Sequence, residues 1–445
     1  MPSIPKALEP RYRTSRVNEA VRLYRGPLQL QVGADIRLAS GAEVLLSWLP
    51  VPRLLVRTSS APPPGYERGL SVAIFCDDFW FCNGNGVFWH GNWYSCQARL
   101  SRIQFGGARS LHTFWFNDLT TGLPENLNNV DFHVVNFPNF IGDNIVEAAQ
   151  IRRGRIVLAA EGWEIRLDNL KETADLHKEL VETGGFGITH VGNLRRTDGA
   201  SFHVDDVKKA LGGVYYFLSF ARGRWVAPVL YSGDSADGEH WQHWGLPLLD
   251  EGAGEWSWPP RLREGAALAS AWPGFLRLWL KDGWQQALAA ALSWYIEAAK
   301  GVLIESHLVS GQAALELLSW VETVEQRGLL TKNGFNSLPA YEHIRLLLTL
   351  SKIPLEIPDE LPDLGKRAAA FNWRDGPSAL VELRNGVVHP SISDRVLGID
   401  IKVRAQAWQL MMHYLRLVFL RLFDYQGSYF EHMTGRDADV PWAKA

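Results

Sequence analysis

The hydrophobic pattern of this chain changes near Trp258-Pro-Pro260, and that change limits the folds available to it. Before it, from about Leu28 to Trp258, apolar and polar residues alternate in short runs separated by Gly, Asn, Asp and Pro. This period is that of a strand with one buried face, so antiparallel sheets are expected. After it, apolar residues recur at helical spacing. The chain is therefore expected to be a multidomain α and β protein, with a β-rich N-terminal half followed by an all-α bundle.

The length suggests more than one core. A chain of 445 residues exceeds the size of an ordinary single domain, so two or three domains are expected. Polar and turn residues cluster at 123–129, which places a first β-rich domain at 1–135 and a second at 136–262. The second is expected to contain one short helix, within 168–186. The helical domain is expected to occupy 266–445.

One tetrapeptide predicts a specific turn in the β-rich half. Asn83-Gly-Asn-Gly86 stands between two aromatic-rich runs. Asn and Gly adopt the positive φ angles of tight turns at little cost, so this segment predicts a β-hairpin.

Five segments of the C-terminal part have helical periodicity. Asp282 precedes the first of them and is the expected N-cap, because its side chain can accept a free backbone N–H. Loops rich in Pro and Gly separate the helices, which are expected at 283–300, 310–326, 341–350, 377–389 and 399–424.

Composition narrows the protein class. The formal net charge is −3 and the pI is about 6.5, so any contact with nucleic acid must be local rather than spread over a basic surface. The three cysteines do not form a disulfide framework and suit a reducing compartment. The N-terminus has no apolar signal-peptide core, and no apolar run is long enough to span a membrane. A cytoplasmic protein without a membrane segment is expected.

The fourth predicted helix contains a candidate catalytic motif. It reads Leu383-Arg384-Asn385-Gly386-Val387-Val388-His389-Pro390, in which four residues separate the Arg from the His. This motif resembles the RNase signature of the HEPN superfamily (higher eukaryote and prokaryote nucleotide-binding), in which Asn often follows the Arg and Pro often follows the His. Ala314-Leu-Glu-Leu-Leu318 resembles the second-helix segment of these domains, and the resemblance covers about 266–445.

Spacing alone does not identify this site, because chance matches are expected in a chain with 13 His and many Arg. Arg196 and His203 form such a match, with six residues between them, in a polar turn of the β-rich half. The pair Arg384 and His389 differs from it because it lies on a helix within an all-α region.

The position of Arg384 gives an independent physical argument. Leu380, Arg384, Val387 and Val388 share one helix face, so Arg384 is expected within an apolar stripe. A guanidinium there needs an anionic partner or a phosphate ligand, because it stays protonated. Glu316 is the expected partner, while Asn385 and His389 are i, i+4 neighbours that can meet.

These residue types suit metal-independent RNA cleavage, in which the ribose 2′-hydroxyl attacks the adjacent phosphorus. His389 would act as general acid or base, and Arg384 would stabilise charge on the phosphorane oxygens. Asn385 would orient these groups and Glu316 would support Arg384. The HEPN resemblance further implies a homodimer through the helical domain, which brings two motifs into one cleft. The expected reaction needs no cofactor.

The same resemblance implies a broader role. A HEPN domain behind a β-rich half looks like prokaryotic toxin or anti-phage proteins, in which the front half senses a ligand or protein and the helical half cuts RNA. The alternative is a non-catalytic HEPN scaffold with a β-rich ligand-binding region, in which Arg384 forms a structural ion pair and His389 caps a helix. A carbohydrate-binding protein is a third possibility and requires exposed Trp rings on one sheet face.

Other groups of residues are candidates for metal, ligand or catalytic sites, and their patterns are less specific. Cys76, Cys82, His90 and Cys96 lack the short Cys-x₂₋₄-Cys spacing of zinc sites, so buried cysteines are expected and no metal is assigned. Asp234, Glu239, His240 and His243 form a polar cluster that is expected to be a solvated loop, with a ligand or metal site as the alternative. Aromatic runs that suit a strand core or a stacking platform lie at 79–81, 88–89, 93–94 and 114–116. No Walker-type loop and no nucleophile elbow occurs in the sequence.

Overall fold

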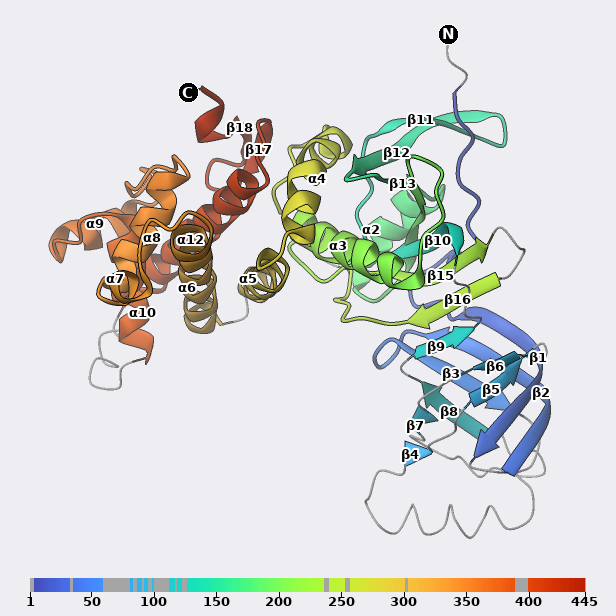
Figure 1. Ribbon diagram of the computed structural model, residues 1–445. Coiled ribbons are helices and arrows are strands. Elements are labelled where there is room, and N and C mark those ends of the chain that lie inside the picture. Colours follow the sequence, from blue (N-terminus) through green and yellow to red (C-terminus); the bar gives the residue numbers. More distant parts are fainter. Residues whose placement is uncertain are drawn as a thin grey trace.

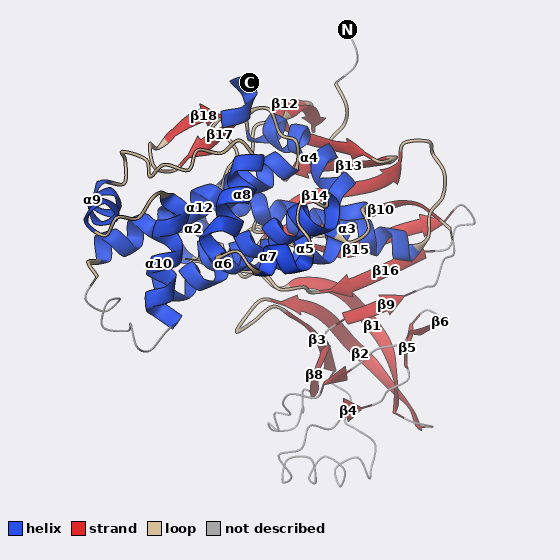
Figure 2. Cartoon of the chain, turned by 60° about the vertical axis from the view of Figure 1, so that its left-hand side comes forward, coloured by secondary structure: helices blue, strands red, loops and turns tan. Residues whose placement is uncertain are grey.

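A computed structural model of the chain places two antiparallel sheets beside a helical region (Figure 1). The structure describes residues 4–444 except 33–34, 59–80, 83–85, 90–91, 95–97, 100–111, 117, 122–125, 236–239, 253–256, 301–302 and 389–398. Figure 2 shows most of the helices beside the strands β10 to β16, with the N-terminal strands β1 to β8 below them. The coarse expectation of sheets followed by helices is confirmed.

The first sheet is formed by the N-terminal strands, in the order β4-β7-β8-β3-β2-β1-β5-β6. Its long strands β1, β2 and β3 alternate apolar and polar residues, which suits a sheet with one buried face. The strands are β1 (Val21–Val32), β2 (Asp35–Ser47), β3 (Arg53–Thr58), β4 (Phe81–Cys82), β5 (Gly86–Trp89), β6 (Asn92–Tyr94), β7 (Ala98–Arg99) and β8 (His112–Phe116).

The hairpin predicted at Asn83-Gly-Asn-Gly86 is wrong. The strand before it, β4, pairs with β7, whereas the strand after it, β5, pairs with β1 and β6. The two flanking strands therefore lie in different parts of the sheet. The local turn preference was overridden because each strand finds its partners elsewhere in the chain.

The second sheet has the order β11-β12-β13-β14-β10-β15-β16-β9. Its strands are β9 (Asp118–Thr121), β10 (Leu127–Val135), β11 (Asp143–Glu147), β12 (Gln150–Ala160), β13 (Trp163–Asn169), β14 (Ile188–Arg196), β15 (Pro228–Ser235) and β16 (His240–Gly245). The boundary expected at residue 135 needs correction, because β10 pairs with β14 and β15 at the centre of this sheet. The change between sheets falls instead between Phe116 and Asp118.

The two faces of the second sheet bury different partners. Val130, Phe132 and Val134 of β10 point into the core shared with the helices. Val135 contributes to a second core, which joins this sheet to strands β1 to β3. Strand alternation thus lets one strand hold both layers together.

The N-terminal segment crosses the second sheet before the first sheet begins. Ala7 N–H donates to the carbonyl of Val146 on β11, and Tyr12 N–H donates to Nε2 of His133 on β10 at 3.1 Å. Leu8 N–H donates at 2.8 Å to Asp168, a fully buried carboxylate that also pairs with Arg155 at 2.7 Å. The segment therefore satisfies an acceptor that the sheet alone would leave incompletely bonded.

Two helices lie within the β-rich half. The predicted short helix is confirmed as α2 (Thr173–Thr183). A second, α3 (Val204–Arg222), was not predicted, although it starts with a capping box in which His203 and Asp206 accept each other's backbone N–H. The aromatic and β-branched residues at its centre favour strands by local propensity, and burial of this helix face outweighs that preference.

The C-terminal part is mostly helical. All five predicted helices are confirmed, with α4, α9 and the small α7 as additions and a π-helix that continues α6. Asp282 is not the N-cap of α5, because Gly283 takes that position with φ of 81°. The elements are α4 (Glu264–Leu280), α5 (Trp284–Ala299), α6 (Ile304–Trp320), the π-helix (Val321–Gln326), α7 (Lys332–Asn336), α8 (Ala340–Leu350), α9 (Pro362–Ala370), α10 (Gly376–Val388) and α12 (Ile401–Leu422).

This part is not all-α, which corrects the expectation. A two-stranded sheet of β17 (Ser428–Glu431) and β18 (Arg436–Asp439) follows α12, and a 3-10 turn (Pro441–Lys444) comes after it. The hairpin returns to the start of the helical region, because Phe430 N–H donates to the carbonyl of Trp258 at 2.8 Å.

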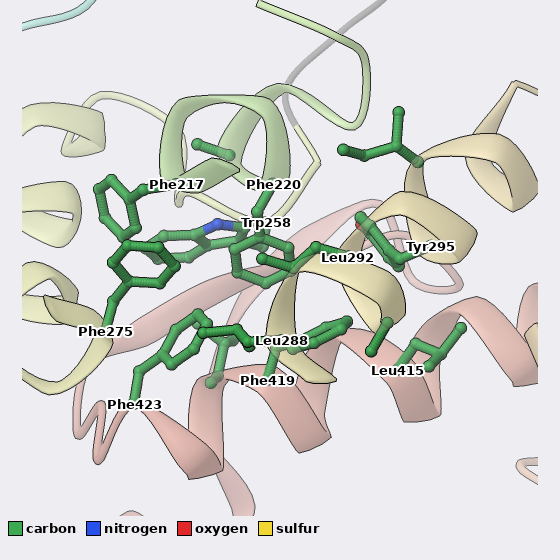
Figure 3. Close-up of a cluster of buried hydrophobic side chains, with 14 of the residues drawn as sticks. Phe217, Phe220, Trp258, Phe275, Leu288, Leu292, Tyr295, Leu415, Phe419 and Phe423 are labelled. Carbon is green, nitrogen blue, oxygen red and sulfur yellow. The ribbon is translucent and has the colours of Figure 1, made fainter. Parts of the chain in front are cut away.

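One hydrophobic core crosses the expected boundary at 262–266. Phe220 of α3, from the β-rich half, contacts Phe419 of α12 with ring centroids 5.2 Å apart. Figure 3 shows the cluster, whose labelled members come from α3, the segment before α4, α4, α5 and the end of α12: Phe217, Phe220, Trp258, Phe275, Leu288, Leu292, Tyr295, Leu415, Phe419 and Phe423. The described part of the chain contains no helix long and apolar enough to cross a membrane.

A matched pair of glycine substitutions tests the helix packing. A Cβ on Gly274 of α4 would overlap the carbonyl of Phe423, so Gly274→Ala should lower the free energy of unfolding by about 1–3 kcal/mol. A Cβ on Gly365 of α9 would meet nothing within 4 Å, so Gly365→Ala should raise it by about 0.5–1 kcal/mol. Urea denaturation measures both. Equal effects of the two substitutions would contradict the close approach of α4 to the end of α12.

Buried histidines give the fold a pH dependence. Burial lowers the pKa of His133 to about 3 and that of His190 well below its usual value. The unfolded chain then binds more protons than the folded chain as the pH falls below about 6.5, so stability should decrease there. His133→Gln should reduce the slope of unfolding free energy between pH 6 and pH 4 by about 1.4 kcal/mol per pH unit. An unchanged slope would show that His133 is protonated in the folded protein.

Candidate functional site

The predicted motif lies at the end of α10, and α10 is held by three other helices. It packs against α6, α8 and α12. Its first turn contains Pro377, which fits because N–H groups of a first turn have no partner within the helix. A Cβ on Gly376 would overlap the hydroxyl of Tyr414 on α12, so the helix start fits closely against that helix.

A buried ion pair fixes the N-terminus of α10. Asp375 accepts two hydrogen bonds from Arg345 of α8, at 2.8 and 3.1 Å, and both residues are 9% exposed. The same carboxylate accepts from the N–H and the hydroxyl of Ser378, so it also caps the helix. Burial acts to raise the pKa of Asp375, but hydrogen bonds from Arg345 and Ser378 outweigh it and the pKa is lowered. The carboxylate is therefore ionised and locks the helix end.

Arg384 lies at the edge of the buried face rather than within an apolar stripe. Leu380 and Leu383 are buried, but Val388 is 37% exposed and Arg384 is half-buried. The C-terminal end of α10 thus emerges toward solvent, which corrects the expected position of the Arg. A guanidinium at such an edge keeps contact with water while its stem packs on the core.

The expected ion pair between Arg384 and Glu316 is wrong. Within the described residues no carboxylate lies within ion-pair distance of Arg384, and its Nε is buried without a hydrogen-bond partner. Glu316 accepts from Gln312 at 2.7 Å and faces Nδ1 of His343 at 3.7 Å. His343 of α8, whose ring stacks on Phe335, therefore lies beside Glu316 in the place expected for Arg384.

The remaining motif residues are placed in part. Asn385 is half-buried, and its Oδ1 accepts from Nη1 of Arg384 at 3.5 Å, the limit of a hydrogen bond. His389 lies outside the described residues, directly after the last residue of α10. Arg384 thus retains donors for a ligand, since its one bond within the described structure is weak.

The polar cluster on β15 and β16 is partly assembled. Nδ1 of His240 lies 2.6 Å from Asp234, and Arg11 of the N-terminal segment donates to Ser232 at 2.7 Å. His243 lies apart from this group, because its ring stacks on Trp241. Glu239 lies outside the described residues. Among the described residues, no group of three or more His, Cys, Asp or Glu side chains is placed to hold a metal ion.

The other sequence candidates divide into two groups. The spacing match in the β-rich half is structural: Arg196 stacks on Trp163 at 4.9 Å, while His203 caps α3. Cys76, His90 and Cys96 lie outside the described residues, as does the side chain of Cys82. The side chains of the aromatic runs at 79–116 also lie outside them.

Sequence reasoning missed a buried polar group at the end of the chain. Glu431 of β17 faces Nδ1 of His413 on α12 at 2.8 Å and accepts from the hydroxyl of Tyr429 at 2.6 Å. Burial acts to raise the pKa of Glu431, but the hydrogen bond from His413 outweighs it and the pKa falls to about 2. No sequence signal joins these residues, because the contact depends on how the hairpin returns to α12.

Removing one partner of the buried pair tests the support of α10. Asp375→Ala should lower the free energy of unfolding by about 2–4 kcal/mol, because Arg345 would keep only Glu342 as a counter-ion and Ser378 would lose its capping carboxylate. Asp359→Ala, an exposed carboxylate before α9, is the matched control and should change stability by less than about 0.5 kcal/mol. The double variant Arg345→Met with Asp375→Leu should recover part of the loss in urea denaturation. Equal losses for Asp375→Ala and Asp359→Ala would contradict the clamp.

Comparison with known proteins gives one name. Residues 123–254 match the family described as the YopA central domain, and residues 281–440 match the YopA C-terminal domain. The chain is 28% identical over 446 residues to the SPbeta prophage-derived uncharacterized protein YopA of Bacillus subtilis (strain 168). The aligned region covers 98% of each chain. No solved structure matches the chain. The first matched region covers the second sheet except β9, the second covers the helical region except α4, and the chain is similar to YopA over nearly its whole length.

Proposed function

We propose that this protein is a metal-independent endoribonuclease of HEPN type, with the β-rich half as its recognition module. The observation that carries the proposal is the state of Arg384. It is half-buried beside a fixed helix, has no carboxylate partner among the described residues, and has a buried Nε without a hydrogen bond. A guanidinium held in this way is suited to a phosphate ligand, which supplies the missing anion.

The chemistry follows from the residues of the motif. Arg384 would donate two hydrogen bonds to the oxygens of the scissile phosphate, where negative charge grows during attack by the 2′-hydroxyl. His389 would accept the proton of that hydroxyl, or return one to the leaving 5′-oxygen. Asn385, which already accepts from Arg384, would orient the guanidinium. Because each chain supplies one Arg and one His, two chains would share a cleft formed by their α10 helices.

The rigid mounting of α10 supports this assignment. The Asp375–Arg345 pair and the tight fit of Gly376 against Tyr414 fix the N-terminus of α10. The C-terminal end, which carries Arg384, is therefore held in a defined position. Catalytic groups need such a support, because small displacements cost large factors in rate. The prophage origin of the relative supports a role in phage biology, such as a toxin or an anti-phage factor.

One observation favours a second candidate, a non-catalytic scaffold of the same fold. Glu316 is engaged by Gln312 and faces His343 rather than supporting Arg384. A motif without this support would bind a partner or a ligand without cleaving it. The two candidates differ in a single measurable property, which is RNA cleavage in the absence of metal.

Cleavage of a defined RNA in EDTA tests the proposal. The wild-type chain should cleave, His389→Ala should be slower by about 10²–10⁴-fold, and Arg384→Ala by about 10²–10³-fold. Arg196→Ala, from the structural pair of similar spacing, should cleave like the wild type. Circular dichroism and urea denaturation check that each variant is folded. Cleavage by His389→Ala at the wild-type rate, or a folded wild type that cleaves no RNA, would leave the scaffold as the better assignment.

A further inference from the structure

The end of α9 carries an unusual combination of side chains. Phe371 is 55% exposed, and its ring stacks on that of Trp373 with centroids 5.7 Å apart and an angle of 29°. The guanidinium of Arg367 lies 4.5 Å from the Phe371 ring and 5.9 Å from the Trp373 ring. We call Arg367, Phe371 and Trp373 the α9 corner.

The backbone holds these rings in place. Trp373 N–H donates to the carbonyl of Ala368 at 2.9 Å, and Asn372 N–H donates to that of Ala369 at 3.4 Å. Asn372 has a φ of 57°, so the two bonds form the Schellman arrangement that ends a helix. The aromatic side chains therefore start from a fixed backbone and lose little freedom when a ligand stacks on them.

Two further basic residues stand next to the α9 corner in the sequence, Lys366 before it and Arg374 after it, and both are exposed. Lys366, Arg367 and Arg374 form no ion pair with another described residue. The carboxylates of this segment lie at the other end of α9 or are already bonded: Asp359 and Glu360 precede the helix, Asp363 accepts from Gln406, and Asp375 pairs with Arg345. In a chain with a net charge of −3, three cations around an exposed aromatic make a local basic surface.

We propose that the α9 corner is a binding site for unpaired bases of single-stranded RNA. Aromatic rings and a guanidinium plane stack on the faces of exposed bases, and nearby cations neutralise the backbone phosphates. A duplex hides its base faces, so this site selects unpaired segments. The site rests on the proposed function and specifies its substrate class.

The position of the α9 corner suits this role. Figures 1 and 2 both place α9 at the outer end of the helical region, away from the two eight-stranded sheets. The corner directly precedes α10, and Arg384 lies eight residues beyond Gly376, or about 12 Å along the helix axis. An RNA strand with a base stacked on Phe371 can therefore run toward Arg384. Its phosphates then lie near the motif.

Binding is measured separately from cleavage, so that the two proposals can fail independently. The full-length His389→Ala protein in EDTA is titrated into a labelled, unstructured RNA oligonucleotide and into the same strand annealed to its complement, with fluorescence anisotropy as the readout. The single strand should bind more tightly than the duplex. Adding Phe371→Ala should weaken binding of the single strand by about 5- to 150-fold. Phe371→Trp should retain it.

Two controls identify the cause of any loss. Trp294→Ala removes the other aromatic that is strongly exposed among the described residues, on α5, and should leave binding unchanged. Lys366→Gln with Arg374→Gln should reduce the slope of log affinity against log salt by about 1.4, or 0.7 for each phosphate contact. Equal effects of Phe371→Ala and Trp294→Ala, or equal binding of single strand and duplex, would overturn the assignment even if the wild type cleaves RNA. Preferential binding of the single strand that Phe371→Ala weakens, without cleavage by the wild type, would support the binding site and reject the proposed nuclease activity.

Discussion

The contact between α3 and α12 is the interaction on which the rest of the structure depends. Phe220 packs against Phe419 and Phe423 with ring centroids 5.2 and 5.6 Å apart, and Trp258 covers it from the connecting segment. Aromatic side chains bury more apolar area than any others, so this cluster provides much of the hydrophobic stabilisation between the two halves. Helix α3, which carries Phe220, also packs against the second sheet, since it contacts β15 and shares a core with β10. Its Phe217 contacts Phe275 of α4. The β-rich half and the helical half are thus parts of one packed body.

Buried polar groups then fix the positions of elements that apolar packing alone does not determine. The Asp375–Arg345 pair sets where α10 begins, and Glu431 with His413 sets how the last hairpin meets α12. Buried ion pairs contribute little net stability, but each permits only a few geometries. Apolar packing alone would allow α10 to rotate or slide, which would move Arg384. The candidate site therefore depends on charges that are remote from it.

Periodicity predicted the element types well and the connections between them poorly. The five C-terminal helices were recoverable, because Ile401–Leu422 and its neighbours repeat apolar residues at helical spacing. Helix α3 was missed because its Tyr, Phe and Val residues have strand propensity. The hairpin at Asn83 was wrong because its two strands pair with distant partners. At the site, the helix that carries the motif follows from sequence. The exposure of its C-terminal end was not predicted, and the presence of His343 instead of Arg384 beside Glu316 depends on packing between α6 and α8.

The N-terminal segment has a consequence for the order in which the chain folds. Leu8 forms a hydrogen bond with Asp168, and Thr14 forms one with Ile188. These bonds can form only after the partners, 160 and 174 positions later in the chain, have been synthesised. Contacts of such long range form slowly, because a large loop must close first. During that interval Asp168 and Arg155 lack part of their hydrogen bonding, and the open face of the second sheet is available to other chains. A nascent protein of this type would gain from a chaperone until its first residues dock.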